Sequence, residues 1–222
     1  MKYNQQEMEL LKDETSQMWR LVISQLEKAK LTFLNSDVEL ALEIVSMERR
    51  VNAFELKIES NCENYIALYN PVAVDLRLVL SIMKICITLE RIGDFAAGIA
   101  RHVVEGDCNS PDSSLVEDLE IEKMFDIVLN MLSDSFVALE SESTLSAGKI
   151  LAKDKEVNRI YRESFQRMND YLQKNPGEIL CGMKIMLLIR KLERIGDHCS
   201  NIVEEIVFYI EAKVLKHKGK AE

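Results

Sequence analysis

The hexapeptide LERIGD at residues 89–94 occurs a second time, without any change, at residues 192–197. Six identical residues separated by 103 positions are not expected by chance. Further matches lie at offsets of 105 and 106 and join three pairs of positions: Glu48 with Asp154, Asn52 with Asn158, and Pro71 with Pro176. A nearly constant offset predicts that one structural unit is duplicated in this chain.

The composition on both sides of each hexapeptide predicts helices. The 222 residues include only 8 Gly and 3 Pro, the two residues least favourable to helices, and 47% of the chain is hydrophobic. Apolar residues recur at spacings of three and four, which is typical of amphipathic helices. We therefore expect six long helices, at about residues 5–34, 37–69, 72–105, 115–139, 143–174 and from 178 onward.

Residues 106–114, rich in Asp, Asn, Ser and Pro, form a loop-like stretch near the midpoint. The predicted fold is therefore all-α, with two tandem antiparallel three-helix bundles at residues 1–108 and 109–222. Asp37 or Ser36 is predicted to cap the second helix and Ser143 the fifth. A polar stripe on the third helix is predicted to face solvent, and it consists of Arg77, Ser81, Lys84, Thr88 and Arg91.

Charge and cysteine content restrict the class of protein. The formal net charge of −9 disfavours binding to nucleic acid or to an anionic membrane surface. The longest apolar run, residues 78–89, contains Lys84 and is too short to span a bilayer. The first residues contain no apolar segment of the kind found in a secretory signal. With an odd number of cysteines, five, and no CxxC pair, we expect reduced core cysteines and a cytoplasmic protein without membrane insertion.

Matched acidic residues form the candidate site. Glu90 and Asp94 are four residues apart on a predicted helix, so their side chains leave the same face at a spacing suited to bridging a cation. The same spacing recurs in the second repeat and on the preceding helices. The candidate metal ligands are Glu48, Asn52, Glu90, Asp94, Asp154, Asn158, Glu193 and Asp197. An alternative interpretation pairs these acids with arginines: Glu90 with Arg91 or Arg77, and Glu193 with Arg190 or Arg194.

The donor types restrict the metal and the chemistry. Oxygen ligands without a thiolate pair favour iron, manganese or magnesium and, less strongly, zinc. No histidine lies three residues after a glutamate, which disfavours a di-iron oxidase of the ferritin type. No phosphate-binding glycine-rich loop is present, which disfavours nucleotide hydrolysis. His198 either adds a ligand or packs at the surface.

The doubled LERIGD and its flanking residues resemble the PhoU family over nearly the whole chain. The flanking residues are Asp75, Leu76 and Arg77 in the first repeat and Asn201, Ile202 and Glu204 in the second. The resemblance implies two three-helix bundles whose E(D)xxxD motifs hold multinuclear iron or zinc, or bind magnesium or manganese. It places those motifs on the eight candidate ligands. Asn52 and Asn158 replace a carboxylate of the motif and Gly98 stands where the second repeat has Asn201, so we expect the first site to bind more weakly or with a different nuclearity.

The resemblance also implies a function. Members of this family are non-enzymatic cytoplasmic regulators, commonly homodimers, that couple a phosphate ABC transporter to a sensor histidine kinase and repress the phosphate-starvation response. Two alternatives remain open: a soluble regulatory partner of a sodium-phosphate cotransporter, and a di-metal hydrolase. Because the chain is acidic, we expect phosphate to be attracted only where bound cations invert the local field.

Overall fold

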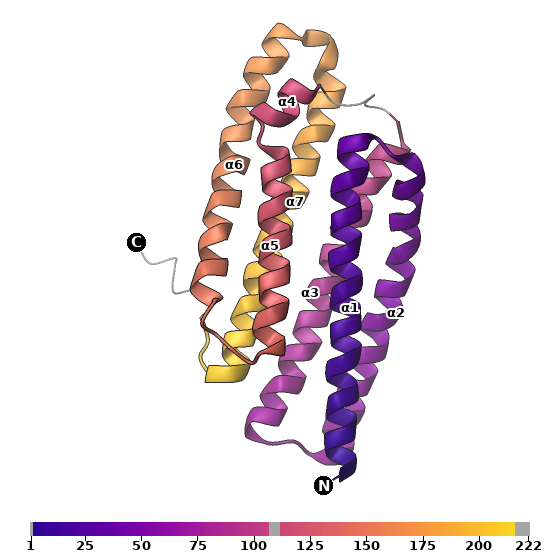
Figure 1. The fold of residues 1–222 in the computed structure, drawn as a ribbon, viewed down its shortest axis with the longest axis vertical. Helices are drawn as coiled ribbons and strands as arrows, with labels where there is room; N and C mark the ends of the chain where they lie inside the picture. Colours follow the sequence, from indigo (N-terminus) through magenta and orange to yellow (C-terminus); the bar gives the residue numbers. More distant parts are fainter. Residues whose placement is uncertain (1, 107–111, 216–222) are drawn as a thin grey trace.

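A computed structural model describes residues 2–106 and 112–215, and the chain forms two three-helix bundles side by side (Figure 1). Three helices of similar length build the first bundle: α1 (Lys2–Asn35), α2 (Val38–Tyr69) and α3 (Ala73–Val104). The second bundle contains α4 (Ser113–Asp118), α5 (Ile121–Glu140), α6 (Ala147–Lys174), the 3-10 turn η1 (Pro176–Glu178) and α7 (Ile179–Glu211). This confirms the predicted all-α fold of two tandem bundles.

Helix boundaries follow local capping, with two corrections to the sequence-based predictions. Asp37 caps α2 as expected, since its Oδ1 accepts a hydrogen bond from the Leu40 amide at 3.0 Å. Asn70 adopts a left-handed conformation and ends the same helix before Pro71. The prediction of Ser143 as the cap of α6 is wrong, because that helix begins after Ser146.

The second correction concerns the fourth predicted helix, which is broken rather than continuous. Helix α4 ends at Asp118 and α5 begins at Ile121, with Glu120 between them at a φ of 53°. The part of the chain that the structure describes therefore has seven α-helices instead of six. The predicted boundary between residues 108 and 109 lies outside the described residues, and the division at that point stays a prediction.

The two bundles contact each other through α3 with α7 and through α1 with α5. Trp19 of α1 is fully buried, and its Nε1 donates a hydrogen bond to the Leu132 carbonyl of α5 at 3.2 Å. The Trp19 ring also packs against Phe136, with ring centroids 5.5 Å apart. These contacts extend one apolar core across both repeats.

The polar stripe predicted to face solvent on α3 lies partly against α7, so that prediction is wrong for part of the stripe. Ser81 is fully buried, and its hydroxyl donates to the Glu205 carbonyl at 3.2 Å. Arg77 Nε donates to the Tyr209 carbonyl at 3.0 Å, and Lys84 forms an ion pair of 3.0 Å with Glu205. Arg77, Ser81 and Lys84 supply hydrogen bonds and an ion pair to the inter-bundle contact. Lys84 and Arg91 are nevertheless exposed.

The cysteines follow the sequence-based expectation in part. Cys62, Cys86 and Cys199 are free and buried in the core. Cys181 is disulfide-bonded, so the expectation that all five are reduced is wrong for this residue. Cys108 lies outside the described residues. None of the helices within residues 2–106 and 112–215 has the length and apolar character needed to cross a membrane.

Candidate metal centres

The acidic residues of the first repeat lie together between α2 and α3. Glu90 and Asp94 lie one turn apart on α3, and their carboxyl groups interact directly with each other. Glu48 of α2 acts electrostatically on Asp94, and Glu55, two turns after Glu48, acts on both α3 acids. Asn52 lies between Glu48 and Glu55 on α2. The structure thus brings the four predicted residues of this repeat together and adds Glu55 to them.

The second repeat has the same arrangement between α6 and α7. Asn158 Nδ2 donates a hydrogen bond to Asp154 Oδ2 at 2.9 Å. Asp154 interacts electrostatically with Glu193 and Asp197, which are one turn apart on α7. Arg194 lies 3.8 Å from Glu193 and 3.6 Å from Asp197. The alternative interpretation, in which Glu193 pairs with an arginine, is therefore confirmed in part. Arg194 is close enough for an ion pair but too far away for a hydrogen bond.

Burial and mutual repulsion raise the pKa of the carboxyl groups in both clusters. The pKa of Glu90 is raised to about 7, first by burial and then by Asp94 and Glu55. The pKa of Asp154 is raised to about 6 by burial, Asp197 and Glu193. The pKa of Glu193 is also raised, by burial and by Asp197. Each cluster therefore holds more negative charge than its own surroundings compensate, which is the condition under which a cation stabilises it.

Unpaired buried oxygens give an independent test of whether these residues fit a metal. Asn52 Oδ1, Asp154 Oδ1 and Glu193 Oε2 are buried without a hydrogen-bond partner, which costs free energy unless a ligand or cation satisfies them. Oxygen donors of this kind fit hard and borderline cations. Across residues 2–106 and 112–215, no three His, Cys, Asp or Glu side chains are already arranged to hold an ion. The ligands fit by type, and side-chain rotation is needed to close them around a metal.

The glycines of the repeated hexapeptide permit close helix packing beside each cluster. A Cβ atom on Gly196 would lie 3.2 Å from Asp154 Oδ1 and 3.3 Å from Val157 Cγ1. A Cβ atom on Gly93 would lie 3.0 Å from Gln25 Oε1 and 3.3 Å from Val51 Cγ1. A mid-helix glycine costs about 1 kcal/mol relative to alanine. Gly196 allows the side chains of α6 to approach the backbone of α7, and Gly93 allows those of α1 and α2 to approach the backbone of α3.

The two clusters differ by one internal cation. In the first repeat Arg101 forms a hydrogen-bonded ion pair with Glu48. Arg101 lies seven residues after Asp94, and the residue seven after Asp197 is Glu204. The first cluster thus contains a guanidinium at the repeat position where the second carries a carboxylate. This difference gives a physical basis for the expectation that the two sites are unequal.

Sequence reasoning missed Glu55 and Arg101, although spacing could have revealed both. Glu55 follows Glu48 by seven residues, which places both on one face of α2, and Arg101 follows Asp94 by the same number. His198, the possible accessory ligand, stacks on Phe95 of α3 with ring centroids 5.7 Å apart. Burial and the nearby Arg91 lower the pKa of His198, as suits a packing residue in the inter-bundle contact.

These observations define a duplicated helical-bundle protein with one acidic cluster in each repeat. The sequence model of the PhoU domain family matches residues 15–103 and 121–206. The chain is 31% identical to the phosphate-specific transport system accessory protein PhoU of Escherichia coli over 97% of this chain and 88% of that protein. It is 32% identical to the PhoU homologue of Aquifex aeolicus over 96% of this chain and 95% of that one.

Solved structures of PhoU proteins have the same fold as this chain. The phosphate transport system regulatory protein PhoU of Streptococcus pneumoniae superposes with a TM-score of 0.86 at 30% identity, covering 96% of this chain and 99% of that one. PhoU of Pseudomonas aeruginosa gives a TM-score of 0.87 at 29% identity, with coverage of 94% and 99%. The chain therefore belongs to the PhoU family.

The repulsion within the second cluster predicts that Asp154→Asn stabilises the metal-free protein at pH 8. Asparagine retains the shape of the side chain and removes one of three repelling charges. We expect the melting temperature of chelator-treated protein to rise by about 2–4 °C, the shift that ~1 kcal/mol produces in a chain of this size. Differential scanning calorimetry measures it, with the exposed Glu63→Gln as the matched control. A lower melting temperature than wild type would contradict the account.

The ion pair of Arg101 with Glu48 predicts that Arg101→Gln strengthens metal binding in the first repeat. To isolate that site, the variant is made in a Glu193→Gln, Asp197→Asn background and titrated with Mn²⁺ by calorimetry. We expect affinity to increase by about tenfold, the scale on which neighbouring groups tune metal sites. Arg101→Lys retains the positive charge and should leave the affinity near that of the background. Unchanged or weaker binding by Arg101→Gln would show that Arg101 does not compete with a metal.

Proposed function

We propose that this protein is a metal-binding, cytoplasmic regulator of phosphate uptake. Membership of the PhoU family over nearly the whole chain supports the link to phosphate transport. The relatives are named as accessory proteins of a phosphate-specific transport system, and one solved neighbour as a regulatory protein of that system. These names describe accessory and regulatory proteins rather than enzymes, which supports a role without catalysis.

Metal binding is the part of the proposal supported by the site. Its ligands would be drawn from Glu48, Asn52, Glu90, Asp94, Asp154, Asn158, Glu193 and Asp197, with Glu55 as an added donor. The unpaired buried oxygens and the raised pKa values of Glu90 and Asp154 are the observations that carry it. Iron or zinc in multinuclear clusters, magnesium or manganese would supply positive charge that an anion such as phosphate requires in a chain with a net charge of −9.

The regulatory role would be that of an adaptor. It would couple a phosphate ABC transporter to a sensor histidine kinase, as a homodimer, and repress the phosphate-starvation response when phosphate is plentiful. The long α3–α7 contact suits such a role, because the two bundles are joined by polar bonds such as Lys84 to Glu205. The relatives that this chain covers over most of their length are named as accessory proteins of a phosphate transport system, which favours this role over a cotransporter partner.

A reporter assay tests the regulatory role directly. In a strain that lacks the gene for this chain, a phosphate-starvation reporter is measured in medium with excess phosphate. Restoring the wild-type chain is expected to lower reporter activity by about fivefold or more, within the range of coupling free energies in regulatory proteins. Glu90→Gln combined with Glu193→Gln should fail to lower it, because both clusters lose a metal ligand.

The control is Glu63→Gln combined with Asp170→Asn, which removes two exposed carboxylates outside the clusters. It should behave as the wild type. Equal expression of all three proteins is checked by immunoblot. If the folded wild-type chain leaves the reporter active in excess phosphate, the proposed regulatory function is wrong, and if the cluster variant represses normally, metal is not needed for it.

A further inference from the structure

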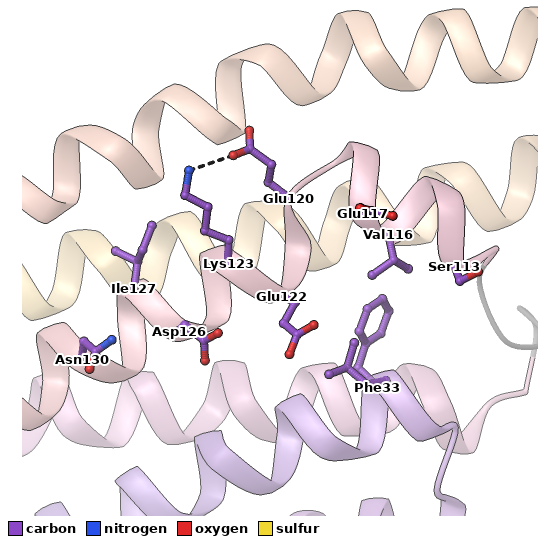
Figure 2. A pocket seen from close by; sticks show the side chains of 11 residues that line it. Phe33, Ser113, Val116, Glu117, Glu120, Glu122, Lys123, Asp126, Ile127 and Asn130 are labelled. Atoms are coloured by element: carbon purple, nitrogen blue, oxygen red, sulfur yellow. Dashed lines mark hydrogen bonds and ion pairs between the residues drawn. The ribbon is translucent and has the colours of Figure 1, made fainter.

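A groove of 710 Å³ lies between the C-terminal end of α1 and the α4–α5 segment (Figure 2). Its apolar lining consists of Phe33, Leu34, Val116 and Ile127. Figure 2 shows Phe33 of α1 pointing toward Val116 of α4. Its volume falls in the range of about 300–1,000 Å³ that is usual for ligand-binding pockets. The groove lies at neither acidic cluster, so it is separate from the proposed metal sites.

The groove occurs beside the break between α4 and α5. Helix α1 runs unbroken over 34 residues, whereas its counterpart in the second repeat turns at Glu120. The positive φ of 53° at Glu120 is uncommon for a residue other than glycine. Its carboxylate accepts hydrogen bonds from Lys123 at 2.8 Å and from Arg159 at 3.1 Å. Ion pairs from α5 and α6 therefore stabilise the turn beside the groove.

The rim of the groove carries an excess of negative charge. Four carboxylates and one ammonium group line it, namely those of Glu117, Glu120, Glu122, Asp126 and Lys123. The ammonium group is already shared between Glu120 and Glu156, at 2.8 and 2.7 Å. Lys30 at the edge bonds to Glu122 at 3.1 Å and Asp126 at 2.7 Å. Arg159 and Arg167 also form ion pairs with Glu120, but the same arginines pair with Glu156 and Glu163, so carboxylates still outnumber basic groups when all these partners are counted. Glu117, Glu122 and Asp126 are exposed.

We infer that this groove binds a basic segment of a partner protein that carries one or two large apolar side chains. The apolar side chains would cover the half-buried Val116 and Ile127, and flanking lysines or arginines would lie against Glu117, Glu122 and Asp126. Apolar anchors within complementary charge are the usual basis of peptide recognition in a groove. A second copy of this chain, with its net charge of −9, is a poorer electrostatic match.

Fluorescence anisotropy with the labelled hexapeptide KKLFKK tests the inference on the full chain. We expect saturable binding that weakens as sodium chloride is raised. Glu117→Lys combined with Glu122→Lys should weaken it by about tenfold or more, since both rim charges are reversed. The matched control, Glu63→Lys combined with Asp170→Lys, makes the same change in net charge at exposed positions outside the groove and should bind as the wild type.

Two further measurements separate docking from non-specific attraction. The peptide KKSSKK lacks the apolar anchor and should bind at least about tenfold more weakly than KKLFKK. Circular dichroism checks that both protein variants remain folded. Equal binding of the two peptides, equal loss in the control variant, or no binding of KKLFKK would overturn the inference. A change of oligomeric state in the Glu117→Lys, Glu122→Lys variant without any peptide binding would also overturn it, because the groove would then lie between copies of this chain.

Discussion

Repulsion among partly buried carboxylates is the constraint on which the rest of the account depends. In each repeat two acids one turn apart on one helix face an acid on its neighbour, and the glycine of LERIGD permits close packing beside them. Water cannot fully solvate these groups, and their own arginines compensate them only in part. A fold that keeps such a charge arrangement twice sacrifices stability at both places, as functional sites often do.

Duplication explains why both repeats have the same three-helix arrangement, and sequence divergence explains why their acidic clusters differ. Arg101 places a cation of the chain itself beside Glu48, whereas the second copy has Glu204 at that position. The counterpart of α1 in the second repeat has diverged as well. It is broken at Glu120, and the groove lined by Phe33 lies beside this break. The contact of α3 with α7 packs the two helices that carry the LERIGD acids against each other.

Much of this architecture could be predicted from the sequence because the repeat is visible in it. Identical hexapeptides at a constant offset indicated three helices used twice, and the spacing of Glu90 and Asp94 indicated a shared face. The burial of part of the polar stripe on α3 could not be predicted, because the partners of Ser81 and Arg77 are backbone carbonyl groups of α7, far away in the sequence. The break at Glu120 was also missed, since no glycine or proline marks it and the partners that hold it, such as Arg159, lie on another helix.

For the candidate ligands too, contacts between helices could not be predicted from the sequence. The eight residues were predicted from spacing and repetition, and the structure places them in two clusters. The seven-residue spacing of Glu55 and Arg101 is visible in the sequence, but that Arg101 pairs with Glu48 follows only from the packing of α2 against α3. Elemental analysis of protein purified without chelator or affinity metal tests the central claim most directly. We expect stoichiometric metal in the wild type and loss of the second-repeat metal in Glu193→Gln, Asp197→Asn. Absence of metal in wild-type protein that has been supplied with iron, zinc, manganese and magnesium would contradict the account and leave the buried carboxylates without a metal-binding role.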